Sequence, residues 1–269
     1  MHKGVYGRNS RILQLLREQG YVAVDDLSQA LDVSQMTIRR DLKDLEQMGL
    51  VNRYHGGASL KPERGDFEWP VLLRETEYLE IKRQIGKVAA GLVKDGDVVI
   101  LDAGTTMLQV AGNLAQNRLT VASNFLPILN ALADKKNVSL IGIGGNLYAD
   151  NQCFIGSLAI NTIRSINANI AIMATSCLSL AKGMTNRNLA EAEVKRAMIE
   201  AAEKVILVMD SSKMHRHTLA SVGALEALDI LVTDDCLAVE DRMAIEARGV
   251  KVLTVACDAA EAQPKEESQ

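Results

Sequence analysis

The stretch that decides the fold of the N-terminal part is residues 33–58, which read VSQMTIRRDLKDLEQMGLVNRYHGGA. Apolar side chains in its first half recur at the spacing of one face of an α-helix. These residues are Ile38, Leu42 and Leu45. Ser34 is a typical N-cap residue and Gly49 interrupts the pattern, so we predict a helix from Ser34 to about Met48.

Two further helices and a wing are predicted around this helix. The first helix is predicted from a stripe of apolar residues and ends at Gly20. That stripe consists of Ile12, Leu13, Leu15 and Leu16. Asp25 or Asp26 would cap a short second helix, and residues 50–58 would form a two-stranded wing that turns at its glycines.

The face of the 34–48 helix opposite its apolar residues carries cationic side chains. A helix packed by one face and basic on the other, after a short turn from a preceding helix, indicates a helix-turn-helix. Arg40 would pair with guanine edges and Met36 would touch a thymine methyl group, whereas the other cations would meet phosphates. The predicted DNA-binding residues are Ser34, Gln35, Met36, Thr37, Arg39, Arg40, Lys43, Arg53 and His55. The alternatives are a solvated helical face and, for His55, an ordinary wing residue.

The composition is that of a globular protein that does not enter membranes. The 269 residues are 48% hydrophobic and 24% charged, with a formal net charge of −4. No apolar run is long enough to span a bilayer and no signal peptide is evident, so we expect a cytoplasmic protein. Four cysteines lack any C-x-x-C spacing, which favours buried free thiols over a zinc site, and we predict no metal and no cofactor. These cysteines are Cys153, Cys177, Cys236 and Cys257.

From about residue 80, short apolar runs alternate with helical stretches, which is typical of an α/β domain with a mostly parallel sheet. The predicted strands are 98–101, 119–122, 138–141, 170–173, 205–209, 230–232 and 252–255. Pro62 and Pro70 lie in a stretch without clear apolar periodicity, which indicates a linker between two domains. We therefore predict a DNA-binding domain at 1–60, a linker at 61–75, an effector-sensing and oligomerisation domain at 76–257, and a polar tail at 258–269.

Polar turns follow several of these predicted strands. The turn at 102–106, which reads DAGTT, opens a helix and offers backbone N–H groups and two hydroxyls to a phosphate, although the same pattern also makes a good capped turn. Because ligands of open parallel sheets lie beyond the carboxyl ends of the strands, we expect these turns to converge on a small anion. Lys213 would supply positive charge there, or would be a surface lysine in a loop. The nucleotide motifs G-x-G-x-x-G and G-x-x-x-x-G-K-[ST] do not occur in the sequence.

The chain resembles the DeoR family of bacterial transcriptional regulators. The resemblance rests on residues 33–42, on Leu45-Glu46 and on residues 53–58, and it extends over residues 80–257. It implies a winged helix-turn-helix followed by a Rossmannoid domain similar to ribose-5-phosphate isomerase. It also implies repression of carbohydrate operons. The predicted effector-binding residues are Asp102, Gly104, Thr105, Thr106, Ser123, Asn124, Gly144, Gly145, Glu191 and Lys213.

Some residues of the effector domain have a second interpretation or depart from the family. Glu191 and Lys195 could simply form an i,i+4 helical ion pair. Phe125 stands where the family often has a serine, and Asn169 and Cys177 replace a common acid and a common glycine. These departures indicate either an altered ligand preference or a partial loss of sensing.

The function predicted from the sequence is therefore a sequence-specific repressor that binds operator DNA and responds to a phosphorylated sugar. It would act as a dimer or tetramer, and the apolar stretch 158–166 could supply the interface or pack internally. The alternatives are a sugar-phosphate isomerase fused to a DNA-binding domain, with Asp102 and Glu191 as candidate bases, and a DNA-binding regulator that has lost its ligand.

Overall fold

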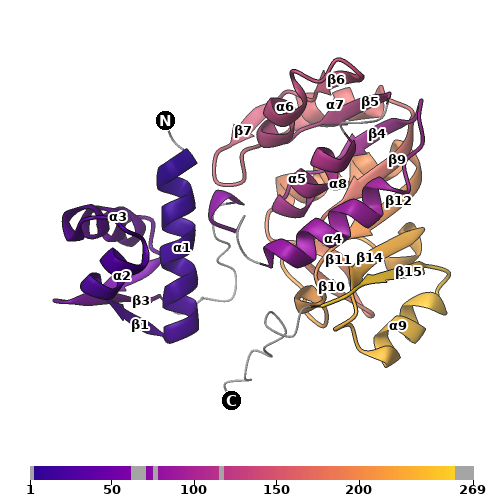
Figure 1. Cartoon of the computed structure of the whole chain (residues 1–269). Helices are drawn as coiled ribbons and strands as arrows, with labels where there is room; N and C mark the ends of the chain where they lie inside the picture. The colour runs from indigo at the N-terminus through magenta and orange to yellow at the C-terminus, as the bar shows by residue number, and fades with distance from the viewer. Residues whose placement is uncertain (1–2, 62–70, 75–77, 115–117, 258–269) are drawn as a thin grey trace. The chain divides into compact units, whose positions relative to one another are not determined.

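The computed structural model describes residues 3–61, 71–74, 78–114 and 118–257, and it divides into two compact units. The first unit covers residues 1–77 and the second covers residues 78–269 (Figure 1). Most of the predicted linker and all of the predicted tail lie outside the described ranges. Within those ranges, no helix is long and apolar enough to cross a lipid bilayer.

The N-terminal unit contains three helices and a small antiparallel sheet, as a winged helix-turn-helix requires. The helices are α1 (Lys3–Gln19), α2 (Val24–Ala30) and α3 (Gln35–Gln47). The strands are β1 (Tyr21–Ala23), β2 (Val51–Arg53) and β3 (Gly57–Leu60), with β3 in the middle. The predicted two-stranded wing is thus extended by β1, a strand too short to give a periodic signal.

The expected capping of the second helix is wrong. The N-cap residue of α2 is Ala23, and Asp25 and Asp26 lie inside the first turn. Their carboxylates are therefore placed to interact with the positive end of the helix dipole without capping it. Ser34 is the N-cap of α3 as predicted, because its Oγ accepts a hydrogen bond from the N–H of Thr37 at 3.2 Å.

A short 3-10 helix, η1 (Val71–Arg74), lies within the stretch that was predicted to be a linker. Its residue Val71 is buried, and η1 packs against α1. The described part of this stretch therefore belongs to the N-terminal unit, whose limit falls after residue 77.

The C-terminal unit is built on a seven-stranded parallel sheet, which confirms the predicted fold class. All seven predicted strands are present, in the order β15-β14-β12-β9-β4-β5-β6. Their bounds are β4 (Val98–Leu101), β5 (Leu119–Ser123), β6 (Val138–Gly142), β9 (Ala168–Met173), β12 (Ala202–Val208), β14 (Ile230–Asp234) and β15 (Lys251–Val255). The chain moves from β4 outward to β6 and then returns to β9 on the other side of β4, so the direction of winding reverses between β4 and β9.

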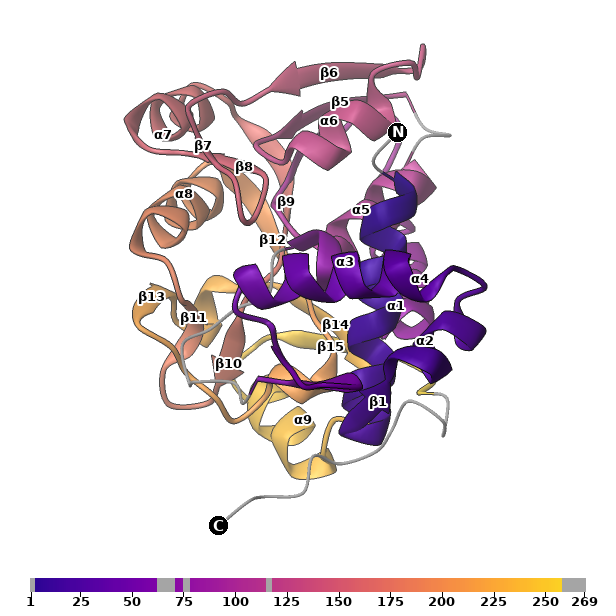
Figure 2. The ribbon, with the colours of Figure 1, turned by 90° about the vertical axis from the view of Figure 1, so that its left-hand side faces the viewer.

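Helices cover both faces of this sheet, so its strands are apolar on both sides. In Figure 2, α7 and α8 lie on one side of the sheet and α4 and α5 on the other. Along β9, Ala171 and Met173 pack in a core cluster with α7 and α8, while the buried alternate residues Ile170 and Ile172 lie outside that cluster. The helices are α4 (Leu79–Ala90), α5 (Thr105–Leu114), α6 (Leu126–Leu132), α7 (Ser157–Arg164), α8 (Leu189–Glu200) and α9 (Val239–Glu246).

Two small antiparallel sheets interrupt the alternation of strands and helices, and the sequence did not predict them. One is a hairpin of β7 (Asn146–Tyr148) and β8 (Cys153–Ile155). The other has the order β10-β11-β13, formed by β10 (Cys177–Ser179), β11 (Gly183–Asn186) and β13 (Ala220–Gly223). These strands have only three or four residues and most of them mix polar and apolar side chains, so they lack the wholly apolar run by which the equally short β4 was found.

The wing leaves no room for a side chain at Gly57. A Cβ atom there would lie 2.3 Å from the carbonyl oxygen of Val22 and 2.5 Å from the hydroxyl oxygen of Tyr21. Overpacking of this kind costs about 1–3 kcal/mol, so Gly57→Ala should lower the thermal transition of the N-terminal unit and leave that of the C-terminal unit unchanged in calorimetry. Gly56→Ala is the matched control, because its Cβ would meet only Tyr21 Oη, at 3.8 Å. Equal losses for the two variants would contradict this packing.

Candidate DNA-reading surface and candidate effector site

The recognition helix α3 is fixed to its domain by one apolar face and one buried ion pair. Ile38, Leu42 and Leu45 are buried, as predicted. Asp41 is also buried, and its two carboxylate oxygens accept hydrogen bonds from the Nε and Nη2 atoms of Arg8 at 2.5 and 3.1 Å. A bidentate pair of this kind fixes both distance and orientation. It anchors α3 to α1, a role that the sequence analysis did not assign to Asp41.

The opposite face of α3 is free to meet a ligand. Met36 is 78% exposed, and the neighbouring side chains on that face are exposed too. These neighbours are Gln35, Arg39, Arg40 and Lys43. Within the described part of the chain, no hydrogen bond or ion pair engages the charged groups of Arg39, Arg40 or Lys43. Three uncommitted cations on one exposed helix face form the surface that major-groove recognition needs.

The wing carries two more of the predicted DNA contacts, Arg53 and His55. The N–H of Tyr54 donates to the carbonyl oxygen of Gly57 at 2.8 Å, which closes a turn that leaves His55 exposed. Arg53 Nη1 lies 3.4 Å from Glu46 Oε2, an exposed pair that links the wing to α3. Ser34 and Thr37 are partly engaged with each other, since their hydroxyl oxygens lie 3.0 Å apart.

In the C-terminal unit, a buried ion pair lies at the point where the winding of the sheet reverses. Asp102 follows β4, and its Oδ2 accepts hydrogen bonds from the N–H of Ala174 at 3.0 Å and from Lys195 Nζ. Lys195 Nζ also donates to the carbonyl oxygen of Ala174 at 3.0 Å. The two side chains thereby join the carboxyl ends of β4 and β9 to α8. Open α/β sheets generally bind ligands at this position, in a crevice beyond the carboxyl ends of the strands where the winding reverses.

Electrostatics keep this lysine charged although it is buried. Burial alone would lower the pKa of Lys195, but the negative charges of Asp102 and Glu191 outweigh that effect and hold the pKa above its usual value. The ion pair of Lys195 is therefore formed with Asp102, which lies 93 residues away along the chain. The simple i,i+4 pairing that the sequence suggested for Lys195 is not its main contact.

Glu191 connects α8 to the β7–β8 hairpin. Its Oε1 accepts hydrogen bonds from Asn151 Nδ2 at 2.9 Å and from Cys153 Sγ at 3.5 Å. Burial and, next, the charge of Glu191 raise the pKa of the Cys153 thiol, so this cysteine stays protonated. The participation of Asn151 and Cys153 was not predicted, because nothing in their local sequence distinguishes them from loop and core residues.

Lys213 contacts the segment that follows β9. Its Nζ donates to the carbonyl oxygen of Thr175 at 3.1 Å, one residue beyond Ala174. Although burial opposes it, the charge of Lys213 and a hydrogen bond from Ser212 hold the pKa of Asp210 below its usual value. The ammonium group of Lys213 is thus held in place by the Thr175 carbonyl. This favours its predicted role of supplying positive charge to an anion over that of a surface lysine in a loop.

The turn at 102–106 and the end of β5 supply polar groups to the same end of the sheet. Thr105 and Thr106 form the first turn of α5, and Gly104 has φ +149°, a conformation that side chains rarely adopt. Asn124 Nδ2 donates to the carbonyl oxygen of Phe154 at 2.9 Å, but its buried Oδ1 has no hydrogen-bond partner in the described structure. A buried acceptor without a partner is rare and needs a ligand or water to satisfy it.

Other predicted residues around this crevice hold the backbone in place. The Ser123 hydroxyl donates to the carbonyl oxygen of Leu101 at 2.8 Å and accepts from the N–H of Phe125 at 3.1 Å, which gives it a structural role. The backbone at Gly145 packs closely against the backbone at Ile155, since a Cβ atom on Gly145 would lie 2.6 Å from the carbonyl oxygen of Ile155. Gly144 is exposed and has open space around it.

One of the three departures from the family pattern, Asn169, lies away from the candidate effector site. Asn169 is at the amino end of β9, where its Oδ1 accepts a hydrogen bond from the N–H of Val98 at 2.9 Å. It therefore lies at the opposite end of the strands from Asp102, and the interpretation that it alters the pocket is wrong. Cys177 is buried in β10 and Phe125 is fully buried beside β5, so both belong to the core around the crevice.

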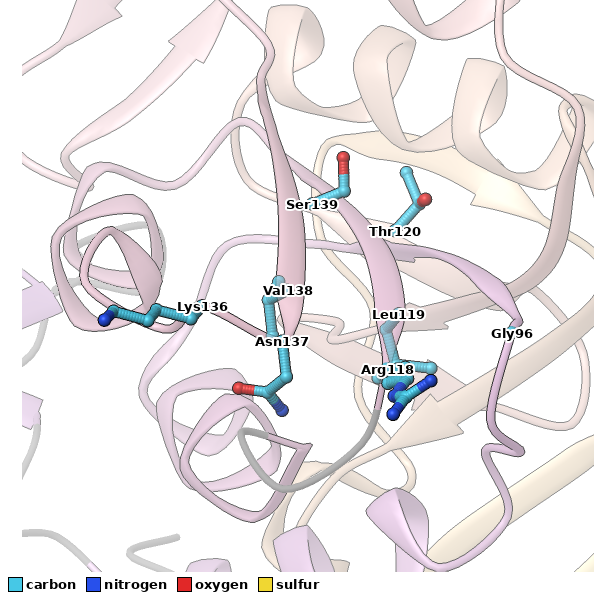
Figure 3. Close-up of a pocket in the computed structure, with 8 residues that line it drawn as sticks. All are labelled: Gly96, Arg118, Leu119, Thr120, Lys136, Asn137, Val138 and Ser139. Carbon is cyan, nitrogen blue, oxygen red and sulfur yellow. The ribbon is translucent and has the colours of Figure 1, made fainter.

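A depression of about 610 Å³ lies at the amino ends of β5 and β6, away from these residues (Figure 3). Its lining residues are Gly96, Arg118, Leu119, Thr120, Lys136, Asn137, Val138 and Ser139. None of them is a predicted effector-binding residue. In a parallel sheet, ligand-binding loops gather at the carboxyl ends of the strands, so this depression is not the candidate effector site.

Comparison with protein families agrees with both halves of this description. A model of the DeoR-like helix-turn-helix domain matches residues 8–64, and a model of the DeoR C-terminal sensor domain matches residues 77–235. The chain belongs to the DeoR family. The prediction of a DNA-binding transcriptional regulator is confirmed.

Similar curated proteins are regulators as well. The transcriptional repressor AccR of Agrobacterium fabrum is 35% identical over 229 residues, covering 84% of this chain and 88% of the relative. The glycerol-3-phosphate regulon repressor of Escherichia coli K12 is 31% identical over 228 residues, covering 84% and 90%. The HTH-type regulator GolR of Listeria innocua is 35% identical over 231 residues, covering 86% and 91%. These names agree with the prediction of a regulator and not an enzyme.

Among solved structures, ribose 5-phosphate isomerase A from Methanocaldococcus jannaschii is similar to part of the chain. The TM-score is 0.39 at 14% identity, over 51% of this chain and 55% of the isomerase. A likeness at this level assigns no residue a role, and the fold class rests on the strand order described above.

The Asp102–Lys195 pair gives a direct stability prediction. Lys195→Met leaves a buried carboxylate without its cation, which should destabilise the C-terminal unit by about 3–5 kcal/mol. The double variant Asp102→Asn with Lys195→Met should recover part of that loss, because it removes both charges. Since the pKa of Lys195 is raised, its stabilisation is complete below about pH 10 and is lost as the pH rises from there through the raised value.

Urea unfolding at pH 7 tests this prediction, with Lys204→Met as the control. Lys204 is an exposed lysine on β12, and its substitution should change stability by less than about 0.5 kcal/mol. If Lys195→Met and Lys204→Met had equal effects, the buried pair would not stabilise the fold as described.

Proposed function

We propose that this regulator represses an operon for carbohydrate uptake or breakdown, and that a phosphorylated sugar bound beside Asp102 controls its affinity for DNA. The observation that carries the proposal is the convergence at the end of β9. Lys195 contacts Ala174 there, Lys213 contacts the adjacent Thr175, and α5 begins close to the same segment. The ammonium groups of Lys195 and Lys213, the N-terminus of α5 and the buried carboxylate of Asp102 are thus all near the end of β9.

Two features of the crevice suit a phosphate group. The first backbone N–H groups of α5, at Thr105 and Thr106, have no acceptor within the helix and attract anions, as any helix N-terminus does. Gly104 lets this turn lie against Ala174, because a Cβ at Gly104 would be 3.4 Å from the Cβ of Ala174. Lys213 adds a full positive charge on the same side of β9.

Other groups suit the hydroxyls of a sugar. Asp102 and Glu191 are buried carboxylates, and Asn124 Oδ1 is a buried acceptor still without a partner. A sugar hydroxyl can donate to any of them. Asp102 is already held by Lys195 and by the N–H of Ala174, so it is poorly placed to act as a free base. This supports binding over isomerase chemistry.

The names of the relatives support the same class of effector. The Escherichia coli relative is named for a glycerol-3-phosphate regulon, which concerns a small phosphorylated polyol. Identity of 31–35% over most of the chain leaves room for a different sugar phosphate here. The proposal therefore names the chemical class of the effector and not a particular compound.

Regulation of this kind needs two arrangements that the effector binds unequally. We propose a cytoplasmic homo-oligomer, dimer or tetramer, that presents two α3 helices to two DNA half-sites. In α7, Ala159 and Ile163 pack internally while Leu158 is 67% exposed. Leu158 is therefore the exposed large apolar side chain of the 158–166 stretch, and we propose that it contacts a second subunit.

Substitutions in α3 should separate base reading from phosphate contact. Arg40→Ala should weaken binding to operator DNA by about 1–3 kcal/mol and reduce discrimination against random DNA. Lys43→Ala should weaken binding to both duplexes nearly equally and lower the salt dependence of binding. Fluorescence anisotropy at several salt concentrations measures both effects. An equal loss on operator and random DNA for Arg40→Ala would contradict its role in reading bases.

The effector proposal predicts selective stabilisation of the full-length protein. In a panel of hexose, pentose and polyol phosphates, at least one compound should raise the thermal transition of the C-terminal unit, and its dephosphorylated form should not. Lys213→Met should weaken that binding at least about tenfold, which corresponds to about 1.4 kcal/mol. Lys182→Met, which removes an exposed lysine from the β10–β11 turn, should have no effect. Stabilisation that survives Lys213→Met would show that the phosphate binds elsewhere.

A further inference from the structure

The fold brings together two cysteines that are far apart in the sequence. Strands β14 and β15 are parallel neighbours, and Asp234 is opposite Val255 in their register. Cys236 follows β14 by two residues and Cys257 follows β15 by two residues. Both thiols therefore emerge at the same edge of the sheet, although their sequence spacing gives no sign of it.

The sulfur atoms of Cys236 and Cys257 and a carboxylate oxygen of Asp234 all lie within 4.8 Å of one another. Cys236 is exposed, Cys257 is partly buried and Asp234 is buried. The expectation of four buried thiols is thus wrong for this pair, and solvent has access to the site they form.

The groups of this cluster are held in place by hydrogen bonds. Asp234 accepts hydrogen bonds from the N–H and the hydroxyl of Ser211 at 2.7 and 2.6 Å, and from the N–H of Cys236 at 3.2 Å. The N–H of Cys257 donates to Asp235 Oδ1 at 2.7 Å. Hydrogen bonds of this type orient the ligands of metal sites, and they are formed here by backbone and side chain alike.

We propose that Cys236, Cys257 and Asp234 form a binding site for a thiophilic divalent cation of the Zn²⁺ class. Two thiolates and one carboxylate are a donor set that Zn²⁺ accepts, with solvent or a fourth ligand completing a tetrahedron. Mg²⁺ and Ca²⁺ prefer oxygen ligands and are disfavoured by the two sulfurs. On binding, each thiol releases its proton to solvent, so the thiolates and Asp234 together place three negative charges around the dication.

A cation here would also stiffen a segment next to the crevice. Asp234 holds Ser211, the first residue of the 3-10 turn η2 (Ser211–Lys213), which ends at Lys213. Metal binding would join the ends of β14 and β15 to that turn through one carboxylate. The site itself does not depend on the effector proposal, because none of its three ligands is a predicted effector-binding residue.

Cobalt substitution tests the site directly. Full-length protein is reduced, stripped with a chelator and titrated with Co²⁺ under nitrogen. We expect one Co²⁺ per chain and a sulfur-to-cobalt charge-transfer absorption, which Zn²⁺ then displaces. Loss of an outer-shell partner costs metal sites about 10–100-fold in affinity, so loss of a sulfur ligand in Cys236→Ser or Cys257→Ser should cost at least as much.

The control variant is Cys177→Ala, which removes a cysteine from β10, outside the cluster, and should leave the titration unchanged. Circular dichroism of each variant separates loss of metal from loss of fold. The proposal is overturned if the reduced protein binds no stoichiometric Co²⁺, or if the absorption persists in the Cys236→Ser, Cys257→Ser double variant. Conversion of the pair to a disulfide without any Co²⁺ binding by the reduced protein would also overturn it.

Discussion

The C-terminal unit depends on the contact between the Asp102 carboxylate and the Lys195 ammonium group. This contact lies at the point where the winding of the sheet reverses, and it joins the ends of β4 and β9 to α8. Two charges removed from water stabilise a fold only when each finds its partner with good geometry. Because Lys195 must reach Asp102, the ion pair fixes the position of α8. It thereby also fixes Glu191 on the same helix and the β7–β8 hairpin that Glu191 holds.

The N-terminal unit uses the same kind of contact for a different purpose. There Arg8 holds the buried Asp41 from the inner side of α3, so that the helix keeps a single orientation. The cations on its outer side, Arg39, Arg40 and Lys43, remain exposed. Each unit thus buries a paired charge to position a surface, which is DNA-reading in one case and, in our proposal, effector-binding in the other.

Much of the fold could be predicted because apolar runs between helical stretches and the capping preference of serine are strong local signals. All seven strands of the parallel sheet and the cap of α3 at Ser34 were found in this way. Short strands such as β1 have too few residues for periodicity to appear. The partner of Lys195 could not be predicted, because a contact over 93 residues depends on the topology of the sheet. For the same reason the meeting of Cys236 and Cys257 gave no sequence signal.

The most direct test of the central claim is release of the full-length protein from DNA by an effector. Labelled DNA from upstream of its own gene and of neighbouring genes is bound at fixed salt, because the phosphate contribution to affinity depends on salt. Hexose, pentose and polyol phosphates are then added to the complex while anisotropy is recorded. Our account predicts release by at least one phosphorylated sugar and none by its dephosphorylated form. Tight binding that the whole panel leaves unchanged would contradict it.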